Sequence, residues 1–136
     1  MDSENAARIY HAWDEALGNR DLAASMALYA PDASLESPLV RHLLGTDVGV
    51  VRGRHELRRF VEQVYQHQPA LRQRYRTGYF TDGRQLIWEY PRVTPSGEQI
   101  DLVEVMELKD GLIQHHRVYW GWRGVKLLEE NRHSRT

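Results

Sequence analysis

The sequence predicts an α+β domain in which helices pack on one face of an antiparallel sheet. In the first half of the chain, apolar side chains recur with the spacing of helices. From about residue 71 onward, apolar and polar residues alternate with the period of strands. Glycine-containing turn sequences at 82–83, 95–97 and 110–111 separate the alternating segments. A run of helices followed by a run of strands is typical of the α+β class.

Apolar spacing predicts three helices, at residues 3–17, 21 to about 29, and about 54–68. Ser3 can cap the first helix, and Gly18 provides its stop. Pro31 interrupts the pattern after the second helix. Pro69 ends the third helix, because the residue before a proline disfavours helical geometry.

Alternation predicts five strands, at residues 33–39, 71–80, 84–93, 99–108 and 112–122. Between the first strand and the third helix, residues 40–51 show no clear periodicity. A loop of this length is either a functional lid or an ordinary surface segment. Arg72, Arg74 and Arg76 recur every second residue, and we expect them on the solvent face of their strand.

Composition is that of an ordinary globular protein, and we expect one domain over residues 1–136. Hydrophobic residues make up 41% of the chain and charged residues 27%, with a formal net charge of -1. This balance gives no basic surface for a nucleic acid or an anionic membrane, so we expect neither as a partner. The chain has no cysteine and no apparent secretory signal, and we expect a cytoplasmic protein.

The strand at 99–108 carries an acidic residue among apolar ones. Leu102, Glu104, Met106 and Leu108 share one face of this strand. Three large apolar side chains favour this face as the core face, with Glu104 in its middle. Two other interpretations stay open: Glu104 pairs with an arginine, or the inner and outer faces are reversed.

The strand at 112–122 determines which residue meets Glu104. His116 and Trp120 lie on one of its faces, and Arg117 lies on the other. A two-residue turn would pair Glu104 with Arg117, whereas a three-residue turn with Gly111 in a bulge would pair it with His116. We favour the second register because it unites the two more apolar faces.

A glutamate facing a histidine between apolar walls is a candidate acid–base pair. Burial favours the neutral form of a carboxyl group, whereas a nearby imidazolium favours the charged form. Glu104 and His116 could therefore exchange protons near neutral pH. The alternative is that His116 is a core histidine whose hydrogen bonds are simply satisfied. His115 and His116 lack a third ligand at a convincing spacing, so we expect no metal, and no phosphate-binding loop indicates another cofactor.

Three segments carry a family resemblance: ALYAPDASLESP, GRHELRRFVEQV and EVMELKDGLIQHHRVYW. Their order and spacing resemble the nuclear transport factor 2-like superfamily, in particular its ketosteroid isomerases and SnoaL-like polyketide cyclases. The resemblance implies a cone-shaped, curved antiparallel sheet wrapped around N-terminal helices, with a deep apolar cavity. It also implies homodimers and, in the enzymes of the family, acid–base chemistry without a cofactor.

The resemblance also suggests roles for single residues. Glu104 matches the oxyanion-stabilising carboxylic acid of the isomerases, and Trp120 matches their pocket tryptophan. Trp13 replaces their oxyanion-binding tyrosine, and Ser37 replaces their base aspartate. A serine cannot accept a proton at neutral pH unless another group activates it, so standard steroid isomerisation is not expected. We expect the substrate to contact the following residues: Trp13, Ser37, Trp88, Met106, Val118 and Trp120.

These patterns lead to three hypotheses for function. The first is an enzyme of the isomerase, cyclase, dehydratase or epoxide-hydrolase type that acts on a small hydrophobic substrate through Glu104 and His116. The second is a module that binds a hydrophobic ligand without changing it. The third is an assembly domain that dimerises through the outer sheet face. We expect that face to carry Val103, Val105, Ile113 and Tyr119.

Overall fold

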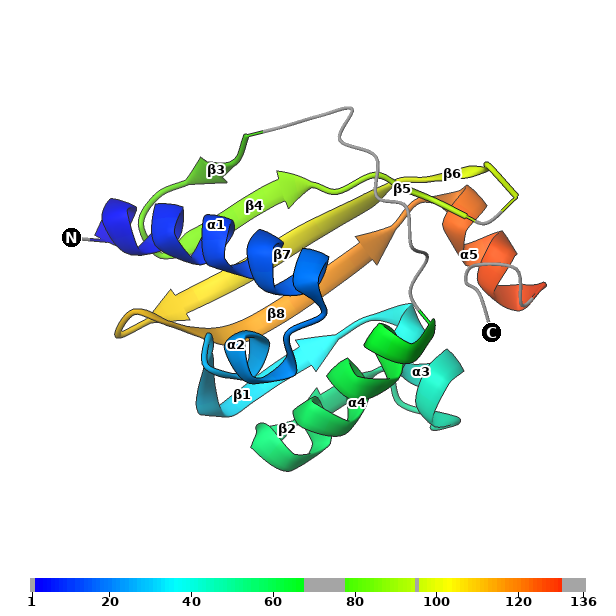
Figure 1. Cartoon of the computed structure of the whole chain (residues 1–136), viewed down its shortest axis with the longest axis horizontal. Helices are drawn as coiled ribbons and strands as arrows, with labels where there is room; N and C mark the ends of the chain where they lie inside the picture. The colour runs from blue at the N-terminus through cyan, green and yellow to red at the C-terminus, as the bar shows by residue number, and fades with distance from the viewer. Residues whose placement is uncertain (1, 68–77, 95, 131–136) are drawn as a thin grey trace.

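The computed structural model describes residues 2–67, 78–94 and 96–130 (Figure 1). The five helices of this part are α1 (Asp2–Asn19), α2 (Leu22–Met26), α3 (Pro38–Leu44), α4 (Gly53–His67) and α5 (Trp122–Glu129). Its strands are β1 (Tyr29–Glu36), β2 (Val50–Arg52), β3 (Phe80–Thr81), β4 (Gln85–Glu89), β5 (Arg92–Val93), β6 (Gln99–Ile100), β7 (Leu102–Lys109) and β8 (Leu112–Trp120). Arg72, Arg74 and Arg76, with most of the strand expected at 71–80, lie outside the described residues.

The main sheet has the strand order β2-β1-β8-β7-β4-β3, and β5 and β6 form a separate hairpin. All neighbours in the main sheet are antiparallel except β1 and β8, which are parallel. The sheet is curved, and α1, α2 and α4 lie over one of its faces (Figure 1). Ile9 of α1, Leu57 of α4 and Met106 of β7 are fully buried between the layers. The α+β class and the curved sheet are therefore confirmed. No helix of the described ranges is long and apolar enough to cross a membrane.

The first strand begins earlier than predicted. β1 starts at Tyr29, which we had placed at the end of a helix, and it continues through Pro31. The pairing of β1 with β8 shifts register between Tyr29 and Ser34. Pro31 and Asp32 are exposed at this irregularity, where a residue without a backbone N–H disturbs no ladder bond.

The segment expected to be an irregular loop begins with a helix, α3. Ser37 caps it by accepting a hydrogen bond from the Leu39 backbone N–H at 3.1 Å, and Pro38 occupies the first turn. Gly45 ends it in the left-handed conformation, with φ of 66°. The prediction of strand to residue 39 and loop to 51 was wrong, because a seven-residue helix shows too little periodicity to identify.

The register of β7 and β8 differs from both predicted alternatives. Asp110 and Gly111 form a two-residue turn with φ of 54° and 77°, and Lys109 lies opposite Leu112. A bulge at Gln114 then shifts the pairing, so that Glu104 lies opposite Val118.

The bulge also reverses the orientation of the residues before it. Ile113 is fully buried, so the prediction that it lies on the outer dimerisation face was wrong. The residues after the bulge keep the expected orientation, and Tyr119 is exposed on the outer face. The homodimer itself stays a prediction.

The last helix, α5, begins where the predicted strand was expected to continue. Gly124 lies so close to the sheet that an added Cβ would come within 2.7 Å of Ile100 and 2.8 Å of Trp120. Only a residue without a side chain allows this contact. α5 therefore packs directly against the β5–β6 hairpin and the end of β8.

Candidate functional site

A cavity of about 80 Å³ lies between the helices and the inner face of the sheet. Most of its wall is apolar and aromatic: Trp13, Leu17, Leu35, Leu39, Phe60, Val61, Val64, Leu102, Val118 and Trp120. Its polar lining residues are Ser25, Tyr29, Ser37, Tyr65, Tyr90, Arg92, Glu104 and His116. An apolar cavity with a few convergent polar groups is the usual form of a small-molecule site.

Glu104 and His116 form a hydrogen-bonded contact in the wall of this cavity. Both residues are 3% exposed, and His116 Nε2 lies 2.6 Å from Glu104 Oε1. Because Glu104 is opposite Val118 rather than His116, this contact runs diagonally across the two strands. The two residues predicted as the catalytic pair are therefore in contact, although by a different register from the one expected.

Tyr29 of β1 extends this contact into a chain of three groups. Its hydroxyl lies 2.8 Å from His116 Nδ1, and the two rings are nearly parallel. Burial raises the pKa of Tyr29, and the negative charge of Glu104 raises it further. Tyr29 therefore keeps its proton and can donate it to Nδ1.

This direction of hydrogen bonding assigns a role to each ring nitrogen of His116. With Nδ1 accepting from Tyr29, His116 carries its proton on Nε2 and donates it to Glu104 Oε1. Among the described residues, no hydrogen bond is formed to the other carboxylate oxygen, Oε2. Glu104 thus has one oxygen fixed by the protein and one available to a molecule in the cavity.

The remaining predicted contact residues fall into two groups. Trp13, Ser37, Val118 and Trp120 line the cavity. Met106 and Trp88 are buried behind this wall and do not line it. Met106 lies opposite His116, and Trp88 packs edge-on against Trp13 with ring centres 5.1 Å apart. The prediction that Met106 and Trp88 contact the substrate is therefore wrong. Both residues instead support the cavity wall from behind.

Ser37 has a structural role at the start of α3. It is buried, and its Oγ accepts the capping hydrogen bond from Leu39. The hydroxyl proton remains available as a donor, whereas the carboxylate of the neighbouring Glu36 is exposed and does not line the cavity. Ser37 can therefore hydrogen-bond a ligand but cannot act as a base there.

Sequence reasoning missed several polar residues of the cavity. Tyr29 was assigned to a helix, so its position beside His116 on a parallel strand was not considered. Tyr90 and Arg92 were placed in a continuous strand at 84–93, although the chain turns after Glu89 into the β5–β6 hairpin. Pro91 was the available signal, because a proline rarely continues an internal strand.

The described residues contain no group of three His, Asp or Glu side chains that could hold a metal ion.

Comparison with known proteins identifies the family. The model of the SnoaL-like domain matches residues 8–116, which is more than half of the chain. The protein therefore belongs to the SnoaL-like domain family, within the nuclear transport factor 2-like superfamily. A search of curated proteins finds no match.

Solved structures agree on the fold. A nuclear transport factor 2-like protein of unknown function from Burkholderia pseudomallei is 20% identical, with a TM-score of 0.73 over 91% of this chain and 96% of that one. A putative ketosteroid isomerase from Kribbella flavida is 19% identical, with a TM-score of 0.67 over 87% and 78%. A de novo designed protein with a curved β-sheet is 14% identical, with a TM-score of 0.72 over 96% of each chain.

At these identities the likeness shows the fold alone. The designed protein shares the curved sheet as closely as the natural ones do, so architecture does not carry an activity. Any function must be argued from the side chains that line the cavity.

Proposed function

We propose that this protein is a small-molecule enzyme that performs acid–base chemistry without a cofactor on a hydrophobic substrate. The reaction would be an isomerisation, cyclisation, dehydration or epoxide opening. The observation that carries this proposal is the buried chain of Tyr29, His116 and Glu104 in the wall of an apolar cavity.

Glu104 is the proposed group for proton transfer. Its Oε2 can accept a proton from a substrate carbon or hydroxyl and return it at a neighbouring position. His116 holds Oε1, so the carboxylate is fixed in orientation before the substrate binds. Tyr29 in turn holds His116 in one tautomer.

The cavity wall suits such a reaction. Apolar and aromatic side chains exclude water, which strengthens the electrostatic effect of each polar group. Ser37 can donate a hydrogen bond to a substrate oxygen that gains negative charge, whereas the single indole N–H of Trp13 is hydrogen-bonded to Tyr29. Oxyanion stabilisation would come from the Ser37 hydroxyl rather than from a second carboxylic acid.

The test compares conversion of small molecules by the wild type and Glu104→Gln. Each purified protein is incubated with the hydrophobic metabolite fraction of its source cells, and the products are followed by mass spectrometry. We expect the wild type to convert at least one compound into a product of equal mass or one differing by water. Glu104→Gln should convert it at least about 100-fold more slowly.

Glu107→Gln is the matched control, because it makes the same change on the outer face of the same strand. It should retain the wild-type rate within about twofold, since exposed ion pairs contribute little. Equal rates for Glu104→Gln and Glu107→Gln would contradict the assignment of Glu104. The circular dichroism spectra of both variants check that they are folded.

A second candidate is a binding module that holds a hydrophobic ligand unchanged. The buried capping role of Ser37 favours it, because the position lacks the base of the isomerases. Native mass spectrometry of protein purified from its source distinguishes the two. An unaltered bound metabolite without any conversion supports the binding module, whereas bound product supports the enzyme.

A further inference from the structure

The cavity contains a buried positive charge at the end that lies toward α5. Arg92 of β5 is 6% exposed and lines the cavity. Among the described lining residues, it is the only one with a permanent positive charge. A buried guanidinium requires acceptors or anions around it, because removing it from water is costly.

The β5–β6 hairpin that carries Arg92 is fixed at several points. Arg92 lies opposite Ile100 in the hairpin, and the backbone N–H of Tyr90 donates to the carbonyl of Leu102 at 2.8 Å. Ile100 in turn lies against Gly124 of α5. The backbone on both sides of Arg92 is therefore held in place.

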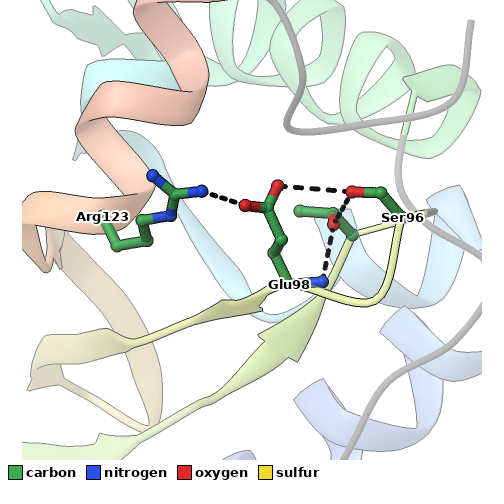
Figure 2. Close-up of polar contacts among 4 residues, drawn as sticks. Ser96, Glu98 and Arg123 are labelled. Atoms are coloured by element: carbon green, nitrogen blue, oxygen red, sulfur yellow. Dashed lines mark hydrogen bonds and ion pairs between the residues drawn. The ribbon is translucent and has the colours of Figure 1, made fainter.

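The loop of the hairpin is attached to α5 by a polar cluster around Glu98 (Figure 2). One carboxylate oxygen of Glu98 binds Arg123 of α5, and the other accepts from Ser96 Oγ at 3.3 Å. Thr94 Oγ1 accepts from the Glu98 backbone N–H at 3.1 Å. This cluster ties the loop to α5, so Arg92 is presented to the cavity by a supported hairpin and not by a loose loop.

The charges of the cavity are distributed unevenly. Glu104 uses one oxygen to bind His116 on the strands β7 and β8, whereas Arg92 belongs to the hairpin beyond the end of β4. Arg92 also interacts with other residues of the protein. Its guanidinium has five N–H donors, so it can keep a protein contact and bind a ligand carboxylate at once.

We propose that the cavity binds amphipathic carboxylic acids, whose carboxylate contacts Arg92 and whose apolar part extends toward Glu104. This inference rests on the proposed function of the cavity as the ligand site, and it names the substrate class. A carboxylate beside Glu104 would be repelled by its negative charge. The ligand therefore binds in one orientation, with its apolar portion next to Oε2 of Glu104.

The test measures binding of matched acids and neutral amides by calorimetry. The panel contains straight-chain carboxylic acids of six to twelve carbons and 2-naphthoic acid, each with its primary amide. At neutral pH, we expect the wild type to bind at least one acid five times or more tightly than its amide. If no acid in the panel is preferred over its amide, the proposal is wrong.

A substitution of Arg92 tests whether this residue causes the preference for the acid over its amide. Arg92→Met should bind the preferred acid no more tightly than its amide, while the affinity for the amide stays within about twofold of wild type. That retained amide binding shows an intact cavity. A preference for the acid that persists in Arg92→Met would assign the anion site to another residue and overturn the proposal.

Glu104→Gln separates this inference from the proposed function. The variant should keep the preference for the acid, because Glu104 does not hold the carboxylate. Acid preference without any Glu104-dependent conversion would leave the substrate class standing and refute the enzyme. Glu104-dependent conversion with equal binding of acids and amides would support the enzyme and refute the proposed substrate class.

Discussion

The two faces of the β7–β8 pair each carry a glutamate in contact with a basic residue, but in different surroundings. On the inner face, Glu104 meets His116, and both side chains are almost completely buried. On the outer face, Glu107 meets Arg117, with side-chain exposures of 41% and 29%. Both contacts join the same two strands, so the backbone supplies the same scaffold to each.

The comparison shows that burial decides what such a pair can do. The outer pair is in contact with water and salt, and its partner Arg117 is always protonated, so it offers no proton exchange. The inner pair contains an imidazole, whose two ring nitrogens can donate or accept a proton, and it borders a cavity. Only the inner pair combines proton exchange with access to a small molecule.

Deleting Gln114 should have the largest effect, because the bulge decides which residues face inward. Without it, either Ile113 turns outward or the segment after the bulge inverts and brings Arg117 into the core. Either change costs more than about 5 kcal/mol, which is comparable to the whole stability of a domain. We expect no cooperative thermal unfolding transition.

Gln114→Ala is the control for that deletion. It keeps the bulge and loses only the exposed hydrogen bond from Gln114 to Asp32 at 3.0 Å. It should lower the free energy of unfolding by no more than about 1 kcal/mol. If the deletion variant unfolds like Gln114→Ala, the bulge does not determine the two faces.

Removing the basic partner should lower the free energy of unfolding much more for the inner pair than for the outer pair. His116→Phe leaves the Glu104 carboxylate buried without its partner, and we expect a loss of about 3–5 kcal/mol in urea denaturation. Arg117→Met should cost less than about 1 kcal/mol, since the outer pair is exposed. Adding Glu104→Gln to His116→Phe should recover part of the loss, because it removes the stranded charge. Similar losses for the two single variants would contradict the comparison.

Tyr29→Phe should change how stability depends on pH. Burial raises the pKa of Tyr29, so the folded protein keeps a proton that the unfolded chain releases above about pH 10. The stabilising contribution is fully present below that pH and is lost as the pH rises. Above about pH 10, the wild type should lose about 1.4 kcal/mol per pH unit more than Tyr29→Phe in urea denaturation. A constant difference between them up to pH 11 would show that Tyr29 is not shielded from water.

Much of the site could be predicted because strand alternation is a local property. The apolar neighbours of Glu104 in β7 indicated its inward orientation, and His116, Val118 and Trp120 were placed on the same side by the same rule. The structure brings Glu104 and His116 into contact as expected. Whether they perform catalysis stays a prediction.

The errors of the sequence-based predictions have a common cause. Each concerns a structural feature that depends on contacts with residues distant in sequence. The bulge at Gln114 leaves no clear mark in the sequence, yet it moves Ile113 into the core. The predicted strand began too late because Pro31 normally interrupts regular structure, whereas here a register shift of β1 against β8 accommodates it. Arg92 was overlooked because its burial depends on how the hairpin packs against α5.

The sequence by itself determined the α+β class, the inward orientation of Glu104 and the absence of a carboxylate at Ser37, because periodicity and residue identity are local. Only the tertiary structure decided the diagonal contact between Glu104 and His116, the approach of Tyr29 from a parallel strand and the burial of Arg92. These features depend on pairing between segments far apart in the chain. Such pairing is fixed by the packing of the whole core, which no single segment encodes.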